Sequence, residues 1–394
     1  MAGESTASVA VQAVHDGVLA FCKFLSANDT GKTGGHQAGI YIPKPAVPII
    51  FSQSYTRGAN HDRRGEIIWH DGKTTCNRFI YYGRGTRNEY RITQFGRGFE
   101  YLSDEHTGDL FVLVKITQDS YQGFILSTEE DIEEFLAAFS MSPSDTGRLI
   151  SYSQVSKDMG EIQLFQNFFN SLTEDFPSTG LMAEKAREIE GFLYNQDQEV
   201  KNNPDKKLLS WIEIEYKLFR FIENIRFNNT NNSAYGSIDD FIAVALTYIN
   251  RRKSRAGKSL EHHLSYIFKS NNLRFSEQTT TEGKVKPDFI FPGKAEYLNK
   301  QWPLERLIFL AAKTTCKDRW RQILNEADRI STKHLFTLQQ GISSEQLKEM
   351  EKNQVKLVVP QKYISTFPKA HQGNILTLKE FIEMVASNCS ESNL

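Results

Sequence analysis

Residues 286–291 read KPDFIF, so Asp288 stands directly before a short apolar run. A second apolar run, Leu307–Ala312, is followed by Lys313, twenty-five residues after Asp288. Short uninterrupted apolar runs are typical of buried strands. We therefore expect two neighbouring strands, with an aspartate at the mouth of one and a lysine at the end of the other.

Around these strands, the chain from Gly160 onward alternates helical periodicity with apolar runs. Besides the runs already quoted, Val355–Val359 is predicted to be a strand. Helices are expected at Ile162–Leu172, Met182–Tyr194, Lys207–Asn224, Ser237–Asn250 and Ser259–Asn271. Helices interleaved with buried strands indicate an α/β domain, which we place at residues 160–394.

The first part of the chain, to about Phe139, shows a β-rich pattern with turn signals between short apolar runs and one flanking helix at each end. Strands are expected at Gly39–Pro43, Pro48–Phe51, Glu66–Trp69, Arg78–Tyr82, Leu110–Ile116 and Tyr121–Leu126. Met141–Asp158 is rich in Ser, Pro and Gly and lacks periodicity, so it is predicted to be a linker. Residues 1–155 are the predicted first domain with this linker.

The composition is that of a globular protein, with 39% hydrophobic and 24% charged residues in 394. No apolar stretch reaches the roughly 20 residues of a membrane span, and the first residues do not form a signal peptide. The four cysteines are scattered without a CxxC pair, which argues against a zinc ribbon or a disulfide framework. We expect a soluble cytoplasmic protein without a membrane partner.

Charge is unevenly distributed although the net charge is only −1. Residues 51–100 hold nine Lys/Arg against five Asp/Glu, and residues 250–290 hold nine against four, whereas residues 123–134 and 160–203 are acidic. A polyanion responds to the local surface and not to the sum. Basic segments of this size are compatible with two alternatives: a solvated surface, or a surface that contacts nucleic acid.

Asp288 and Lys313 form the skeleton of a PD…K nuclease site. Phosphodiester hydrolysis needs carboxylates that hold a divalent cation, and a positive charge beside the attacking water. The pattern normally has a second carboxylate two residues before the lysine, where this chain has Ala311. Glu326, on a predicted helix after the strand, and Glu261, after the basic segment 251–255, are the candidates to replace it.

The segment that follows Lys313 favours contact with bases over a solvated surface. Lys317, Asp318 and Arg319 present cation, carboxylate and cation in succession at a predicted helix start. Lys and Arg donate to guanine O6 and N7, and a carboxylate accepts from the cytosine amino group. The alternative is that Asp318 is a helix N-cap between solvated neighbours.

Other phosphate-binding motifs fail on spacing. Gly31-Lys32-Thr33 and Gly257-Lys258-Ser259 end like a phosphate-binding loop, which requires a further glycine five residues earlier. Those positions hold Ser26 and Arg252. No nucleotide cofactor is therefore expected.

With these residues in place, the chain resembles the EcoRII-type restriction endonucleases. The similarity rests on residues 250–261, 286–289 and 313–328 in the second half, and on residues 25–43 and 86–98 in the first. It implies an N-terminal B3-like β-barrel that binds DNA as an effector and a C-terminal PD-(D/E)XK nuclease domain. It also implies a bacterial, homodimeric, Mg²⁺-dependent enzyme that cuts double-stranded DNA before the first C of a CCNGG-like core and leaves a 5′ overhang.

The resemblance assigns roles to individual residues. Asp288 and Glu326 match the metal positions, and Lys313 and Glu261 match further catalytic positions. The base-reading triplet is Lys317, Asp318 and Arg319, with Arg252 in a neighbouring DNA-contact segment. The effector domain's recognition arms correspond to His36, Tyr41, Arg87, Glu89 and Arg91.

The chain departs from the family pattern at a few positions. Ile212 stands where the family has an arginine that helps to flip the central base, so base flipping stays an open question, with Trp211 as a candidate to stack on the base. In the first domain, Gly85 and Tyr90 occupy positions that are usually basic. Two other functions remain open: a B3-type DNA-binding regulator with an inactive nuclease domain, and a PD-(D/E)XK repair nuclease of low specificity.

Overall fold

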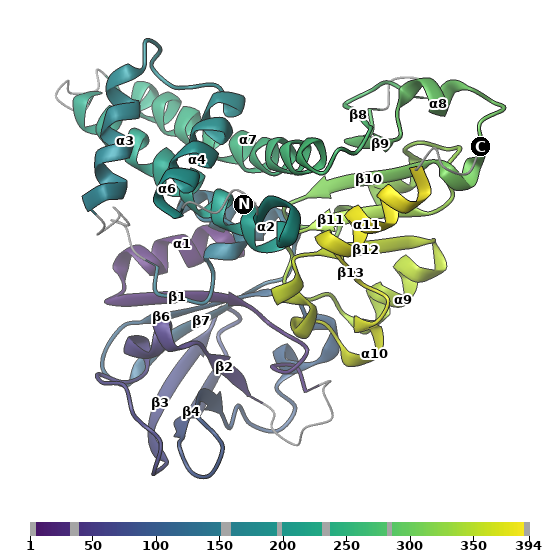
Figure 1. Cartoon of the computed structure of the whole chain (residues 1–394). Coiled ribbons are helices and arrows are strands. Elements are labelled where there is room, and N and C mark those ends of the chain that lie inside the picture. Colours follow the sequence, from purple (N-terminus) through teal and green to yellow (C-terminus); the bar gives the residue numbers. More distant parts are fainter. Residues whose placement is uncertain are drawn as a thin grey trace.

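The computed structural model describes residues 5–31, 39–150, 159–194, 199–230, 237–281 and 286–389. Figure 1 shows a β-rich region built from the first part of the chain and an α/β region built from the second, in contact along helix α2 (Glu129–Ala138). The architecture is mixed α/β with curled sheets, as expected in outline. Within the described ranges, no helix combines the length and hydrophobicity that crossing a membrane requires.

The N-terminal sheet has seven strands in the order β1-β6-β7-β3-β4-β5-β2. They are β1 (Leu19–Phe24), β2 (Ile40–Ile42), β3 (His61–Trp69), β4 (Thr74–Tyr82), β5 (Glu89–Thr93), β6 (Leu110–Lys115) and β7 (Ser120–Leu126). Neighbours are antiparallel except β3 and β7, which are parallel. The edge strands β1 and β2 are linked through side chains, because Lys23 Nζ donates to Tyr41 O (3.1 Å) and Tyr41 N donates to Asp29 Oδ1 (2.7 Å).

Both faces of this sheet are covered, because alternate residues of a strand point to opposite faces. In β6, Phe111 and Leu113 lie in one apolar cluster, whereas Val112 and Val114 lie in a second cluster beneath helices α1 (Thr6–Asp16) and α2. These are the two flanking helices predicted from the sequence. The sheet therefore carries α2 as a rigid outer layer.

The prediction of a strand at Pro48–Phe51 is wrong, because this segment lies at the end of a 3-10 helix, Lys44–Ile49. Pro45 and Pro48 fix φ near −65° and lack the N–H that a sheet ladder needs, which favours the turn. Strands β1 and β5 were not expected. Short 3-10 helices also form at Glu100–Leu102, Asp104–His106 and Pro143–Asp145.

The second half begins with a group of helices. They are α3 (Met159–Ser171), α4 (Thr179–Tyr194), α5 (Glu199–Asn202), α6 (Pro204–Thr230) and α7 (Ile238–Ser270). The two helices expected at 237–250 and 259–271 are one helix, because the basic segment between them consists mostly of good helix formers. Arg252 and Arg255, one turn apart in this segment, face the acidic residues Glu223 and Glu215 of α6.

The C-terminal sheet has the order β13-β12-β11-β10-β9-β8. Its strands are β8 (Ser276–Glu277), β9 (Phe289–Phe291), β10 (Ile308–Lys313), β11 (Lys333–Thr337), β12 (Val355–Val359) and β13 (Leu376–Thr377). β10 to β13 are parallel, whereas β9 is antiparallel to both β10 and β8. The remaining elements are α8 (Lys294–Leu298), α9 (Ser344–Lys352), α10 (Lys369–Gln372), α11 (Leu378–Cys389) and the 3-10 helices Leu304–Arg306, Arg319–Asn325 and Gln361–Thr366.

Candidate active site

The aspartate and the lysine of the PD…K pattern meet at one end of the β9–β10 pair. Phe289 lies opposite Leu310 in the antiparallel register, so Asp288 follows at the position opposite Ala311, near the end of β10. The backbone N–H of Ala312 donates to Asp288 Oδ2 at 2.9 Å, and Asp288 is only 8% exposed. The strand that carries Lys313 therefore also fixes the orientation of the carboxylate.

Glu326 is brought to the same place, but not by the α-helix that we expected. The chain forms a 3-10 helix at Arg319–Asn325, and Glu326 follows it in an extended conformation. Burial and the negative charge of Asp288 raise the pKa of Glu326 to about 7, against a lowering effect of Lys313. Asp288, Lys313 and Glu326 thus lie close enough to feel one another's charge.

Glu261 completes the group from helix α7. Its Oε2 accepts hydrogen bonds from Lys258 Nζ (2.7 Å) and Gln278 Nε2 (3.1 Å). Burial and the charge of Asp288 raise the pKa of Glu261, while Lys258 and Lys313 oppose this shift. Gln278 was not anticipated, because an exposed glutamine after a two-residue strand carries no sequence signal.

Asp288, Glu326 and Glu261 provide carboxylate oxygens, which are the ligands that a divalent cation such as Mg²⁺ prefers. Within the described part of the chain, no three His, Cys, Asp or Glu side chains are grouped closely enough to hold a metal. Asp288 and Glu326 nevertheless offer two mutually repelling carboxylates, and Mg²⁺ is commonly bound by one or two carboxylates together with water and substrate phosphate. The residues therefore fit a cation that reaches its full coordination only with substrate.

The predicted base-reading triplet contacts the N-terminal half of the chain, although only Lys317 is buried and Asp318 is exposed. Lys317 is 8% exposed, and its Nζ pairs with Asp109 Oδ1, just before β6. The backbone N–H groups of Asp318 and Arg319 donate to Glu129 Oε2 at 3.0 and 2.9 Å. Arg319 also forms a bidentate pair with Glu133, at 3.1 and 2.9 Å. The interpretation of Asp318 as a helix N-cap is half right, since it precedes the 3-10 helix but its side chain makes no capping bond.

Arg252 is held at the same interface. Its guanidinium pairs with Glu223 (2.7 Å) and donates to the carbonyl oxygens of Ala137 (3.1 Å) and Ala138 (2.7 Å). These carbonyls end helix α2, where the helix dipole is negative and favours a cation. Arg252 therefore contacts the N-terminal domain in this conformation.

A cavity of about 260 Å³ lies between α2 and two of the candidate catalytic residues. Its lining includes Glu129 and Glu133 of α2 together with Arg252, Glu261 and Lys313. Two carboxylates of α2 therefore share a cavity with Glu261 and Lys313.

In the N-terminal domain, the expected effector contacts lie on or near the edge of the sheet. Tyr41 is half-buried on β2, and Arg87 lies over the ring of Tyr82 at 5.2 Å. Arg91 is buried, where its Nη1 donates to Gly39 O at 3.2 Å and its guanidinium pairs with Glu89 at 3.4 Å. His36 lies outside the described residues.

Trp211 is not accessible for stacking on a base in this conformation. Trp211 is 2% exposed and packs against His263 and Tyr266, with ring centroids 5.6 and 5.5 Å apart. Ile212 and Tyr216 are buried as well. The expectation that Trp211 stacks on a base finds no support here.

Comparison with known proteins covers both halves of the chain. Residues 14–147 match the family described as restriction endonuclease EcoRII, N-terminal, and residues 219–382 match EcoRII C terminal. The type II restriction enzyme EcoRII of Escherichia coli is 39% identical over 383 residues, which cover 92% of each chain. The type II restriction enzyme SsoII of Shigella sonnei is 24% identical over 170 residues, 38% of this chain and 54% of that protein.

Two solved structures of DNA complexes are also similar. Metal-depleted Ecl18kI with uncleaved, modified DNA has a TM-score of 0.46 and 20% identity, covering 61% of this chain and 87% of that one. The complex of restriction endonuclease PspGI with substrate DNA has a TM-score of 0.45 and 15% identity, covering 54% and 93%. Because the match to EcoRII extends over nearly the whole length of both proteins, the chain belongs to the EcoRII-type restriction endonucleases and is a site-specific DNA nuclease.

Proposed function

We propose that this chain is a homodimeric, Mg²⁺-dependent type II enzyme that cuts both DNA strands at a palindrome with a CC-N-GG-like core and leaves 5′ overhangs. Its first domain, which we take to be B3-like, binds DNA as an effector and restrains the nuclease domain until then. The proposal is supported by the geometry of Asp288, which accepts from Ala312 N beside Lys313 and is linked to Glu261 through Gln278, and by the cavity that Glu261 and Lys313 line together with Arg319 of the predicted triplet.

Each residue has a role that follows from its position. Asp288 and Glu326 would hold the cation, which when bound supplies positive charge to a non-bridging phosphate oxygen. Lys313, at the end of β10, stabilises the hydroxide that develops from the attacking water. Lys317 and Arg319 donate to guanine, and Asp318 accepts from cytosine, once α2 has left.

The test of this function is digestion of a sequenced plasmid with and without Mg²⁺, followed by sequencing of the ends. We expect discrete ends at a CC…GG palindrome, lost without Mg²⁺ and lost in Lys313→Ala. Scattered ends would indicate the low-specificity nuclease. Intact plasmid despite tight DNA binding would indicate the regulator.

Restraint by the first domain is supported by the chemistry of its contacts. Asp109, Glu129 and Glu133 supply carboxylates to the donors that would otherwise face DNA. A bound duplex and α2 compete for the same side chains, so cleavage requires that the interface opens. The backbones of Gly108 and Gly341 also pack closely across this interface. A Cβ added to Gly108 would lie 2.3 Å from Gly341 O.

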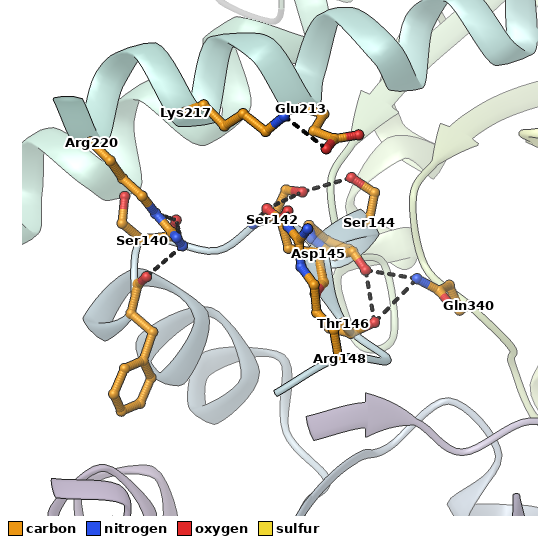
Figure 2. A network of polar contacts seen from close by, with 12 residues as sticks. Ser140, Ser142, Ser144, Asp145, Thr146, Arg148, Glu213, Lys217, Arg220 and Gln340 are labelled. Atoms are coloured by element: carbon orange, nitrogen blue, oxygen red, sulfur yellow. Dashed lines mark hydrogen bonds and ion pairs between the residues drawn. The ribbon is translucent and has the colours of Figure 1, made fainter. Parts of the chain in front are cut away.

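The segment after α2 is also tied to the nuclease half, as Figure 2 shows. Arg220 of α6 donates to Phe139 O (2.7 Å) and Ser140 O (2.8 Å), and Gln340 donates to Pro143 O (2.7 Å). Ser142 and Asp145 form a capping box that makes this turn rigid. The start of the predicted linker is therefore part of the interface and not a free tether.

Removal of the first domain tests the restraint. A cut directly before Phe176 would remove α3, whose Phe165 and Phe168 pack with Met182 and Leu218. A chain that begins at Met159 keeps that core intact. Its rate on single-site DNA should exceed that of the full chain, and an unchanged rate would refute the restraint.

The proposed homodimer is supported by an apolar face on the first half of α7. Exposed residues recur at helical spacing there, with exposed fractions of 36% to 78%: Ile238, Phe241, Ile242, Leu246 and Ile249. A contiguous apolar patch on a soluble surface is typical of an interaction site. A two-fold dimer would present the same recognition segment to both half-sites of a palindrome. Leu246→Glu should give a monomer in sedimentation, whereas an unchanged dimer would place the interface elsewhere.

A further inference from the structure

Gln278 lies between two active-site acids that no other described side chain connects. Its Nε2 donates to Asp288 Oδ1 at 2.8 Å and to Glu261 Oε2 at 3.1 Å. Only the amide nitrogen can occupy this place, because the amide oxygen would face two carboxylates without a hydrogen to share. The orientation of the amide is thus determined by its neighbours.

The backbone around Gln278 is built to reach this position. Glu277 pairs with Phe289 in the β8–β9 ladder, and the N–H of Gln278 donates to Asp288 O at 3.1 Å. Gln278 has φ of +50°, a left-handed conformation that residues other than Gly, Asn and Asp seldom adopt. An uncommon conformation at an exposed residue with these contacts indicates that the position of the side chain matters.

A neutral donor suits this position better than a charged one. Asp288 and Glu261 repel each other, and a donor between them offsets part of that repulsion. An added cationic side chain would offset more of it, but its charge would also repel a metal ion bound by Asp288. An amide supplies two hydrogen bonds without that cost.

We propose that Gln278 is a positioning residue, whose amide ties the carboxylate of Asp288, the proposed cation ligand, to that of Glu261 and so fixes the orientation in which Asp288 meets a divalent cation. The inference rests on the metal role proposed above for Asp288. Partners that orient metal ligands typically change metal affinity or activity by about 10- to 100-fold when they are removed.

Two variants of the full-length chain distinguish the effect of the amide donor from the effect of the backbone conformation. Gln278→Met keeps the length of the side chain and removes the donor. Gln278→Gly also removes the donor, but it relieves the cost of the left-handed backbone. Gln163→Met is the matched control, because Gln163 donates to Asn167 Oδ1 at 3.0 Å on the exposed surface of α3.

The readouts are binding of Mn²⁺ without DNA, followed by electron paramagnetic resonance, cleavage rate with Mg²⁺, and DNA affinity without metal. We expect both Gln278 variants to lose about 10- to 100-fold in Mn²⁺ affinity and in cleavage rate. DNA affinity and the Gln163→Met control should stay at the wild-type level.

Other results would overturn the inference. Wild-type Mn²⁺ affinity in both variants would do so while the proposed function stands, since the wild-type chain would still cleave. Loss in Gln278→Met with full recovery in Gln278→Gly would assign the effect to the apolar methionine side chain beside two carboxylates and not to the missing amide donor. A wild-type chain that neither binds Mn²⁺ nor cleaves would remove the proposed function itself.

Discussion

Glu129→Ala should release the nuclease half from the first domain. The carboxylate of Glu129 is 3% exposed and accepts hydrogen bonds from Thr315 Oγ1 (3.1 Å), Asp318 N (3.0 Å) and Arg319 N (2.9 Å). When the two halves of the chain separate (the open state), water satisfies these donors. When they are in contact (the closed state), the donors of the variant face an alanine. The substitution therefore destabilises the closed state selectively.

The size of the effect follows from two opposing terms. Hydrogen bonds to a charged group contribute about 1.5 to 3 kcal/mol each. However, burial raises the pKa of Glu129, so desolvation of its carboxylate cancels much of this gain. A net loss of about 2 kcal/mol is reasonable, which corresponds to roughly 30-fold more open protein at about 1.4 kcal/mol per factor of ten.

The assay is the initial cleavage rate of a plasmid with one recognition site, at saturating Mg²⁺. We expect a rate about 30-fold above wild type as long as the closed state predominates in the wild-type chain. Glu134→Ala is the matched control, because Glu134 is on the same helix but accepts from Ser8 Oγ (3.0 Å) within the first domain. A folded Glu129→Ala protein whose rate stays within twofold of this control would refute the reasoning.

Three further predictions use the same proteins. Glu133→Ala should raise the single-site rate by only about 2- to 5-fold, since its pair with Arg319 is partly exposed and contributes less than about 1 kcal/mol. Apparent Mg²⁺ affinity should rise about tenfold between pH 6 and pH 8 in a cleavage titration, because Glu326, with a pKa of about 7, must ionise to bind the cation; a flat profile would contradict this. His334 has its pKa lowered by burial to about 4, so the folded state binds its proton more weakly than the unfolded state. Unfolding free energy should therefore fall by about 3 kcal/mol from this residue as the pH drops from 6.5 to 4. In denaturant titrations, His334→Gln should remove that part of the slope, and equal slopes would be the contrary result.

Asp288 and Lys313 could be predicted from the sequence because the information is local. Each stands at the end of a short apolar run, and the pairing of Phe289 with Leu310 brings the two run ends together. Glu326 was one of two candidates for the missing carboxylate, which the resemblance to a family then favoured, and the α-helix expected to carry it was wrong. A 3-10 helix that ends before it delivers the carboxylate instead. Gln278 depends on a strand of two residues and a left-handed backbone, neither of which leaves a pattern in the sequence.

The interface between the domains could not be predicted at all from local patterns. Glu129 and Asp318 are 189 residues apart, and the contact depends on how two separately folded units pack. The sequence showed that residues 123–134 are acidic and that residues 250–290 are basic, but not that these segments come to lie near each other. Only the structure shows that α2 carries Glu133 of the acidic segment to Arg319, and that Glu129, Glu133 and Arg252 line the same cavity.

This contact sets two carboxylates of α2 against the segment that we propose to bind DNA. Glu129 accepts from the backbone N–H of Arg319 and Glu133 pairs with its guanidinium, so under the proposal DNA and α2 compete for the same segment. Because opposing charges are screened by salt, raising ionic strength weakens both the internal contact and the contact with DNA. Salt should therefore reduce cleavage less steeply in the full-length chain than in a chain that begins at Met159, because only the full-length chain loses its restraint as it loses affinity. An equal or steeper decline in the full-length chain would show that the acidic helix is not an electrostatic competitor of DNA.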